Sequence, residues 1–224
     1  MKKEVKYKPV NICAAIVAAV CIICVSVTAT VIARPLYYMD IKNLEIPQTS
    51  GYSATVCKEN YDVLIDYNLL GGPSELELPS FNMSEQGEIH FAEVREIFMV
   101  MQGISIIAVV AAAGILSHII EASKRHAGKR ELIRSRSLWM RYTGVVLIVV
   151  TAVIGIAMAI DWQWSFEMMH RIFFDNDYWL FDPVHDPVIT ILPDEFFMHC
   201  GILIVLLSVT QAVLLEFGYR RINR

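Results

Sequence analysis

Two histidines of this 224-residue chain, His90 and His170, are titratable groups that could do acid–base chemistry. Imidazole has an ordinary pKa near 6.5, so it can accept a proton and return it near neutral pH. The sequence predicts a helix that begins at Ser84 and carries His90, and a short amphipathic helix over residues 165–174 that carries His170. Each helix adjoins a long uncharged segment, so both imidazoles are expected near one membrane surface, at the depth of lipid ester bonds.

A metal site is the alternative use of these side chains. Zinc binds histidine and carboxylate ligands, and many carboxylates surround the histidines here. However, the sequence contains no HxxxH or HxxEH motif, which is the spacing that places two ligands on one helix face. We therefore expect no metal ligands among the histidines that lie in or next to the acidic segments, which are His90, His170, His185 and His199.

Glu93 is the carboxylate placed closest to His90 along the predicted helix. The two residues are three positions apart and so share one helix face. Glu93 could orient or charge the imidazole, or the two could form a plain surface ion pair.

Four segments without Asp, Glu, Lys or Arg must position these residues. A helix rises about 1.5 Å per residue, so even the shortest segment nearly spans the roughly 30 Å core of a bilayer. A soluble domain could not cover four such helices, which excludes a cytosolic enzyme, a nucleic-acid binder and a disordered chain. The predicted transmembrane segments are residues 9–33, 97–120, 142–160 and 196–215.

The basic residues are concentrated in three of the five polar segments, and this distribution predicts the topology. The two ends and the loop of residues 121–141 contain 14 of the 19 Lys and Arg residues, whereas residues 34–96 and 161–195 contain 5 together with 19 of the 23 acids. Lys and Arg are retained on the cytoplasmic side. Both termini are therefore expected inside, and the two acidic segments outside.

The acidic segments are expected to form a small extracytoplasmic α+β cap. Residues 61–70 have a helical pattern that stops at two glycines and a proline, whereas residues 75–78 and 188–192 have the pattern of short strands that could pair. Asp194 and Glu195 open the fourth transmembrane helix with favourable charge. The whole chain, residues 1–224, is expected to form a single integral membrane domain.

Taken in this order between four transmembrane segments, several motifs resemble the bacterial lipoprotein intramolecular transacylase (Lit) family. The resemblance covers nearly the whole chain and is most specific from His170 to Phe197. The motifs are residues 61–64 with Gly71 and Gly72, residues 88–95, residues 166–179, residues 186–189 and residues 192–197.

The resemblance implies an acyltransferase of the bacterial cytoplasmic membrane with its active site on the extracytoplasmic side. Such enzymes act on lipoproteins whose N-terminal Cys carries an S-diacylglyceryl group, and they move the sn-2 acyl chain to the α-amine of that Cys. The product is a lyso-form lipoprotein. The resemblance implies catalytic roles for His90 and His170 and no cofactor. Besides the lipoprotein, the expected partner is membrane lipid, and no nucleic acid is expected.

General chemistry agrees with this reading. An α-amine has a pKa near 8, so it is partly protonated at neutral pH and needs a base. His170, in the denser motif, is expected to be the general base and His90 the second catalytic histidine, although the two roles could be reversed. The tetrahedral oxyanion needs a hydrogen-bond donor, which the sequence leaves open among Arg171, Asn176, Trp179 and backbone N–H groups.

Two other classes of protein fit the residues taken without the resemblance. One is a membrane sensor or assembly partner, not an enzyme, whose outer loops bind another protein. The other is a metal-dependent membrane hydrolase.

Overall fold

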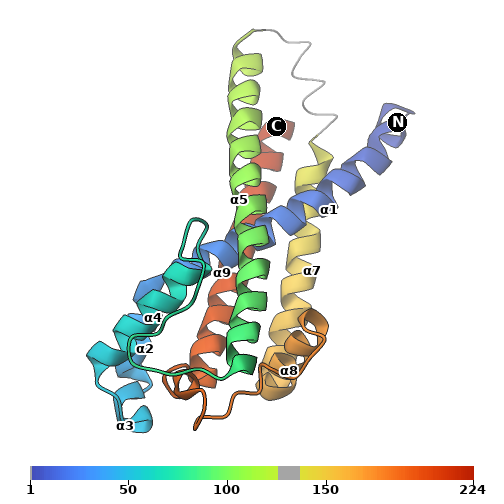
Figure 1. The fold of residues 1–224 in the computed structure, drawn as a ribbon. Helices are drawn as coiled ribbons and strands as arrows, with labels where there is room; N and C mark the ends of the chain where they lie inside the picture. Colours follow the sequence, from blue (N-terminus) through green and yellow to red (C-terminus); the bar gives the residue numbers. More distant parts are fainter. Residues whose placement is uncertain (1, 126–136) are drawn as a thin grey trace. The chain divides into compact units, whose positions relative to one another are not determined.

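The computed structural model describes residues 2–125 and 137–224, and throughout these ranges the regular elements are helices (Figure 1). Four of the helices are long, and the shorter ones lie in the two acidic segments. In chain order the elements are α1 Lys2–Val31, α2 Arg34–Asn43, α3 Ile46–Ser50, α4 Ala54–Asn68, α5 Glu85–Arg125, α7 Leu138–Ile160, α8 Trp162–Phe173, the 3₁₀ helix η1 Pro187–Ile191, and α9 Asp194–Asn223.

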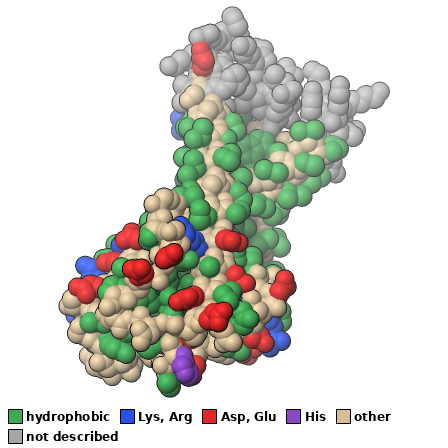
Figure 2. Space-filling view, in the orientation of Figure 1, with side chains coloured by type: hydrophobic (Ala, Val, Ile, Leu, Met, Phe, Trp, Pro, Cys, Tyr) green, Lys and Arg blue, Asp and Glu red, His purple; other side chains and the backbone are tan. Residues whose placement is uncertain are grey.

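The four long helices contain nearly all residues of the four predicted transmembrane segments. Each is long and apolar enough to cross a membrane. In their most apolar stretches only 11–22% of the residues are buried within the protein. Figure 2 shows many hydrophobic side chains along the helix shafts that face the viewer. Such a surface suits lipid chains rather than water.

The predicted cap of one helix is confirmed, whereas the predicted start of a second helix is wrong. Ser84 caps α5: its Oγ accepts a hydrogen bond from the N–H of Gly87 at 3.0 Å. Asp161 caps α8 by accepting from the N–H of Trp164 at 2.9 Å, so this helix begins at Trp162 rather than at residue 165. A polar side chain at this position satisfies one of the free backbone donors of the first turn.

The described residues group into two compact units, each formed by several stretches of the chain. The first, which we call the histidine unit, consists of Thr28–Gln102 and Ile156–Leu203. The second, the four-helix unit, consists of Met1–Val27, Gly103–Gly155 and Ile204–Arg224.

An aromatic cluster forms the centre of the histidine unit. The rings of Tyr37 on α2 and Tyr61 on α4 stack with centroids 3.9 Å apart, and Phe196 on α9 meets both edge-on. The hydroxyl of Tyr37 donates to the backbone oxygen of Ile191 at 2.7 Å. This buried bond joins the two acidic segments, because Tyr37 lies in one and Ile191 in the other.

The two predicted strands are wrong, and no strand occurs in residues 2–125 or 137–224. Residues 75–78 have no regular structure, and the second candidate forms η1. Val188 and Ile191 are both 1% exposed. These residues are three positions apart, and three residues make one turn of a 3₁₀ helix, so both side chains face the core. The cap in the described part of the chain is therefore helical.

Short polar contacts join the helices of the four-helix unit. The hydroxyl of Ser208 donates to Oγ of Ser26 at 3.1 Å, and Nε2 of Gln211 donates to the same oxygen at 2.9 Å. The hydroxyl of Thr143 lies 3.3 Å from the backbone oxygen of Ala15. Small residues and side-chain hydroxyls at helix contacts are typical of packing in a membrane, where the hydrophobic effect does not drive helices together.

Asp186 fixes the start of α5 through two hydrogen bonds to Ser84. The carboxylate of Asp186 accepts from the backbone N–H of Ser84 through one oxygen and from the Ser84 hydroxyl through the other, both at 2.8 Å. Gly87 lies directly against this carboxylate: a Cβ on Gly87 would be 2.4 Å from Oδ1 of Asp186.

Gly87→Ala should therefore destabilise the histidine unit. The added methyl group displaces Asp186 and weakens the cap, at an expected cost of about 1–3 kcal/mol in the free energy of unfolding. Thermal unfolding in detergent measures this as a lower Tm. Gly103→Ala is the matched control on the same helix, because a Cβ there meets no atom within 4 Å. Equal Tm values for the two variants would contradict the proposed clash.

Candidate active site

His90 and His170, which are 80 positions apart in the sequence, lie next to each other in the structure. His90 projects from the second turn of α5 and His170 from the last turn of α8, and their ring centroids are 5.9 Å apart. The side chains are well buried, with residue exposures of 5% and 8%. The two titratable groups that the sequence placed at one membrane surface thus form a single cluster.

One hydrogen bond defines which nitrogen of His170 is free. Nδ1 lies 2.9 Å from the backbone oxygen of Phe166, one helical turn earlier. A carbonyl oxygen only accepts, so Nδ1 carries a hydrogen and, in the neutral ring, Nε2 has the lone pair. His170 is therefore held in the tautomer that can accept a proton at Nε2.

Aromatic rings surround both imidazoles. Trp179 stacks on His170 with centroids 4.7 Å apart and planes 25° apart, and Phe166 lies 4.3 Å from the same ring. Phe174 meets His90 edge-on at 4.7 Å. This burial lowers the pKa of His170, although the hydrogen bond to the Phe166 backbone opposes the effect. The His170 imidazole is therefore neutral at pH 7.

His90 has a polar atom without a partner. Its Nδ1 is buried, and no described residue offers it a hydrogen bond. An unsatisfied buried nitrogen costs free energy, so such atoms are uncommon in folded proteins outside functional sites. The nitrogen is available to a bound molecule.

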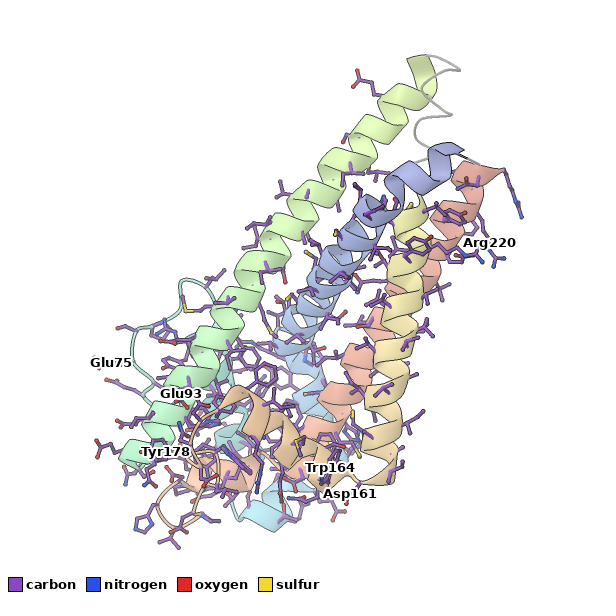
Figure 3. The ribbon with its side chains drawn as sticks, turned by 90° about the vertical axis from the view of Figure 1, so that its right-hand side faces the viewer. Glu75, Glu93, Asp161, Trp164, Tyr178 and Arg220 are labelled. Atoms are coloured by element: carbon purple, nitrogen blue, oxygen red, sulfur yellow. The ribbon has the colours of Figure 1, made fainter. Side chains whose placement is uncertain are left out.

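Glu93 contacts Asn176 rather than His90. Nδ2 of Asn176 donates to Oε1 of Glu93 at 2.8 Å, and Oδ1 of Asn176 accepts from the N–H of Tyr178 at 3.0 Å. Figure 3 shows Glu93 on α5 beside the segment that carries Tyr178. The second carboxylate oxygen, Oε2, is buried without a partner among the described residues. Glu93 therefore holds the segment after α8 and keeps one oxygen free.

Two of the predicted donors already make hydrogen bonds within the protein. Nε1 of Trp179 donates to the backbone oxygen of Asn176 at 3.1 Å, so this N–H is already used. An amide nitrogen carries two hydrogens. Nδ2 of Asn176 uses one of them on Glu93 and keeps the other.

The structure leaves three other polar candidates outside the buried cluster. Arg171 is exposed, and its guanidinium lies 4.0 Å from Glu167 one turn earlier on α8. His185 is exposed and contacts Asp182. His199 contacts the buried carboxylate of Asp40, with Nδ1 2.9 Å from Oδ2. Among the described residues, no group of three His, Cys, Asp or Glu side chains could hold a metal ion.

Two positioning residues escaped the sequence analysis. Phe181 lies 5.5 Å from His90 and stacks on Phe91, with centroids 5.3 Å apart. Arg95 donates to the backbone oxygens of Ser74 and Gly72 and so anchors the loop after α4. Neither role has a local signal, because each depends on a contact between distant parts of the chain.

The comparisons with known proteins agree with each other. The family model described as lipoprotein intramolecular transacylase Lit matches residues 12–197. Among solved structures, the membrane-integral lipoprotein intramolecular transacylase Lit from Bacillus cereus is 29% identical, with a TM-score of 0.82. The match covers 96% of this chain and 94% of that one.

Two further structures of the Bacillus cereus protein are also similar. Each carries a substitution of one histidine, by Arg in the first and by Ala in the second, and both have a TM-score of 0.76 at 29% identity. These matches cover 96% of this chain and 91% and 92% of those chains. Among curated proteins, none matches this chain.

Proposed function

The chain belongs to the lipoprotein intramolecular transacylase family Lit, and on that premise we propose that it is an acyltransferase that acts on diacylglyceryl-modified bacterial lipoproteins. The enzyme moves the sn-2 acyl chain of the S-diacylglyceryl group to the α-amine of the N-terminal Cys. The product is a lyso-form lipoprotein. No other molecule donates the acyl chain.

The observation that carries this proposal is the buried histidine pair. The rings are 5.9 Å apart, one has Nε2 free to accept a proton, and the other has an unpartnered Nδ1. Acyl transfer from an ester to an amine needs a base for the amine and an acid for the leaving oxygen, and it needs no Ser or Cys nucleophile. Two imidazoles with free nitrogens can supply both functions.

In the first step, the α-amine attacks the carbonyl carbon of the sn-2 ester. Nε2 of His170 accepts a proton from the amine, and a carbon–nitrogen bond forms. The carbonyl oxygen becomes an oxyanion. Nδ2 of Asn176 has a spare hydrogen that could donate to this oxygen, as could His90, whose Nδ1 has no other partner.

In the second step, the carbon–oxygen bond to glycerol breaks. The leaving oxygen receives a proton either directly from the protonated His170 or from His90, which accepts the proton of His170 as it gives up its own, so both imidazoles end neutral as they began. The products are an amide on the Cys nitrogen and a free glycerol hydroxyl. Because donor and acceptor are parts of one molecule, holding them together can supply several kcal/mol, and up to about 7–11 in ideal cases.

Glu93 has the position of a substrate-binding residue. Its Oε2 is free and buried, while Oε1 is bonded by Asn176. A carboxylate oxygen can accept from an amine N–H and orient it. Arg171, on the exposed side of α8, suits contact with lipid headgroups, and Trp179 positions His170 by stacking on it.

The outer surface of α8 supports entry of the substrate from the membrane. His170 and Phe166 face the cluster, whereas Trp164, Met168 and Ile172 are 54%, 37% and 71% exposed. These three residues are four positions apart and form an apolar stripe along the helix. A helix with such a stripe lies in the interfacial region of a bilayer, where ester bonds are found.

We expect this site on the extracytoplasmic side, with both termini in the cytoplasm. Phosphatase or fluorescent-protein fusions at Arg224 should report the cytoplasm, and a fusion within residues 43–53 should report the outside, because Lys and Arg are retained inside. Reversed signals would move the histidine pair to the cytoplasmic side and contradict the proposed reaction.

The pH dependence of the acyl-transfer rate should reflect a His170 imidazole that is neutral at pH 7. Because burial lowers the pKa of His170, the base should lose activity only below the ordinary imidazole value of about 6.5. The free energy of unfolding should also fall as pH drops through about 6.5, since the unfolded chain then binds a proton that the folded chain does not. NMR of ¹⁵N-labelled histidine measures this titration, with the His170 signal assigned by its absence in His170→Gln. Titration above pH 6.5 would contradict the burial argument.

The direct test of function uses purified chain and a purified diacylglyceryl lipoprotein in detergent. The N-terminus of the lipoprotein should become blocked to Edman degradation, because an amide nitrogen is not nucleophilic. The substrate incubated with detergent alone is the control. A free N-terminus after prolonged incubation with active, folded chain would contradict the proposal.

A further inference from the structure

A groove runs along the four-helix unit, between the start of α7 and the end of α9. It has a volume of about 590 Å³ and is lined by residues between Arg141 and Val149 on α7 and between Ala212 and Arg220 on α9. A Cβ on Gly144 would lie 3.4 Å from the backbone oxygen of Ala212, so the two helices approach closely beneath the groove.

The groove is polar at one end and apolar over the rest of its length. Arg141, Glu216 and Arg220 lie at the polar end, and Figure 3 shows Arg220 near the end of α9. The lining side chains further along are aliphatic, for example Ile148 and Val213. The groove therefore has the polarity of a phospholipid, with a charged head and a hydrocarbon chain.

The length also fits one leaflet. Eight residue steps separate Arg141 from Val149, and a helix rises about 1.5 Å per step, so the groove extends roughly 12 Å. One leaflet contributes about half of the roughly 30 Å bilayer core. A lipid chain lying in the groove would thus reach from the headgroup region to near the bilayer centre.

The charges at the polar end favour an anionic headgroup. Arg220 is paired with Glu216, with Nε 2.7 Å from Oε1. Arg141 lies over the ring of Tyr219 at 5.7 Å, and no described carboxylate forms an ion pair with it. The net charge of the three side chains is +1, and the guanidinium of Arg141 is free to bind a phosphate through two N–H groups.

We propose that this groove is a binding site for an anionic phospholipid, with the phosphate at Arg141 and one acyl chain along α7 and α9. This lipid is a structural ligand and not a substrate, because neither His90 nor His170 is among the residues that line the groove. With both termini inside, the lipid belongs to the cytoplasmic leaflet.

Native mass spectrometry of the full chain tests the proposal. The protein is equilibrated in detergent with equal amounts of dioleoyl phosphatidylglycerol and dioleoyl phosphatidylcholine, which differ only in the headgroup. Wild type should retain the anionic lipid preferentially. Arg141→Gln should lower that preference about fivefold, the effect of one basic residue near anionic lipid. Val145→Trp should fill the groove and lower retention of both lipids.

Two control variants separate this site from general attraction to the membrane. Arg221→Gln removes a charge from the last turn of α9, outside the groove, and Val153→Trp adds the same bulk to α7 beyond it. Both should behave as wild type, and the transacylase activity and Tm of all four variants report that they are folded.

Three results would overturn the proposal. The first is equal retention of the two lipids by wild type. The second is equal effects of Arg141→Gln and Arg221→Gln. The third is a dimer that Val145→Trp abolishes, because the groove would then hold a second copy of the chain.

Discussion

Replacing His170 by alanine should lower the rate of acyl transfer by about 100- to 10,000-fold, the usual contribution of a positioned base. The variant loses the imidazole whose Nδ1 is bonded to the backbone oxygen of Phe166 and whose Nε2 can therefore accept a proton. His90→Ala should have an effect in the same range, because it removes the partner ring 5.9 Å away. Turnover of purified diacylglyceryl lipoprotein at saturating substrate measures both.

His185→Ala is the matched control. This side chain is 71% exposed and contacts Asp182 instead of the buried cluster, so the variant should turn over at the wild-type rate. The double variant of His90 and His170 should lose less than the product of the two single losses, because the two rings act on one proton transfer. Retained activity in His170→Ala, at normal protein level, would refute the assignment of the base.

The second prediction concerns the mass of the lipoprotein, which should not change when the enzyme acts. Moving an acyl chain from a glycerol oxygen to the amine of the same molecule adds and removes no atoms. Fragments that separate the peptide from the glyceryl group should change in mass, since one acyl chain now stays with the peptide as an amide. The reaction should proceed with purified substrate in detergent, without added phospholipid, nucleotide or metal. Intact and tandem mass spectrometry of the N-terminal lipopeptide checks each point.

Other masses would identify other chemistry. A gain of one acyl chain, or a need for added phospholipid, would indicate transfer between molecules. A loss of one acyl chain would indicate a lipase, in which water attacks the ester in place of the amine. Incubation with the double histidine variant is the control. Product at the wild-type level in that sample would indicate that this chain does not catalyse the reaction.

The aromatic burial of the histidine pair explains how one site can favour the amine over water. Phe166, Phe174 and Trp179 cover the two rings, so few positions near Nε2 of His170 remain open to solvent. A nucleophile delivered by the substrate itself then has an advantage over free water. Trp179→Ala should accordingly raise the ratio of hydrolysis to transfer.

The sequence by itself determined the membrane architecture and several helix starts. Uncharged stretches longer than a bilayer core have few alternatives to a spanning helix, because every backbone polar group must be satisfied within the segment. Ser84 predicted the start of α5 through a bond to a backbone N–H three residues later, and the same kind of bond from Asp161, which was not predicted, explains the start of α8. Such features depend on neighbours along the chain, so a pattern of residue types is enough to reveal them.

Only the tertiary structure decided which side chains contact one another at the histidine pair. The sequence placed His90 and His170 at one membrane surface, but periodicity tells which face of a helix a residue occupies and not which distant residue it faces. Only the structure therefore shows the 5.9 Å approach of the two rings and the bond from Asn176 to Glu93. The same reason explains the wrong strand at residues 188–192. Residues 188–191 are all β-branched and suit a strand, but packing Val188 and Ile191 into one core selected a 3₁₀ turn, because burial outweighs the weak local preference of a five-residue segment.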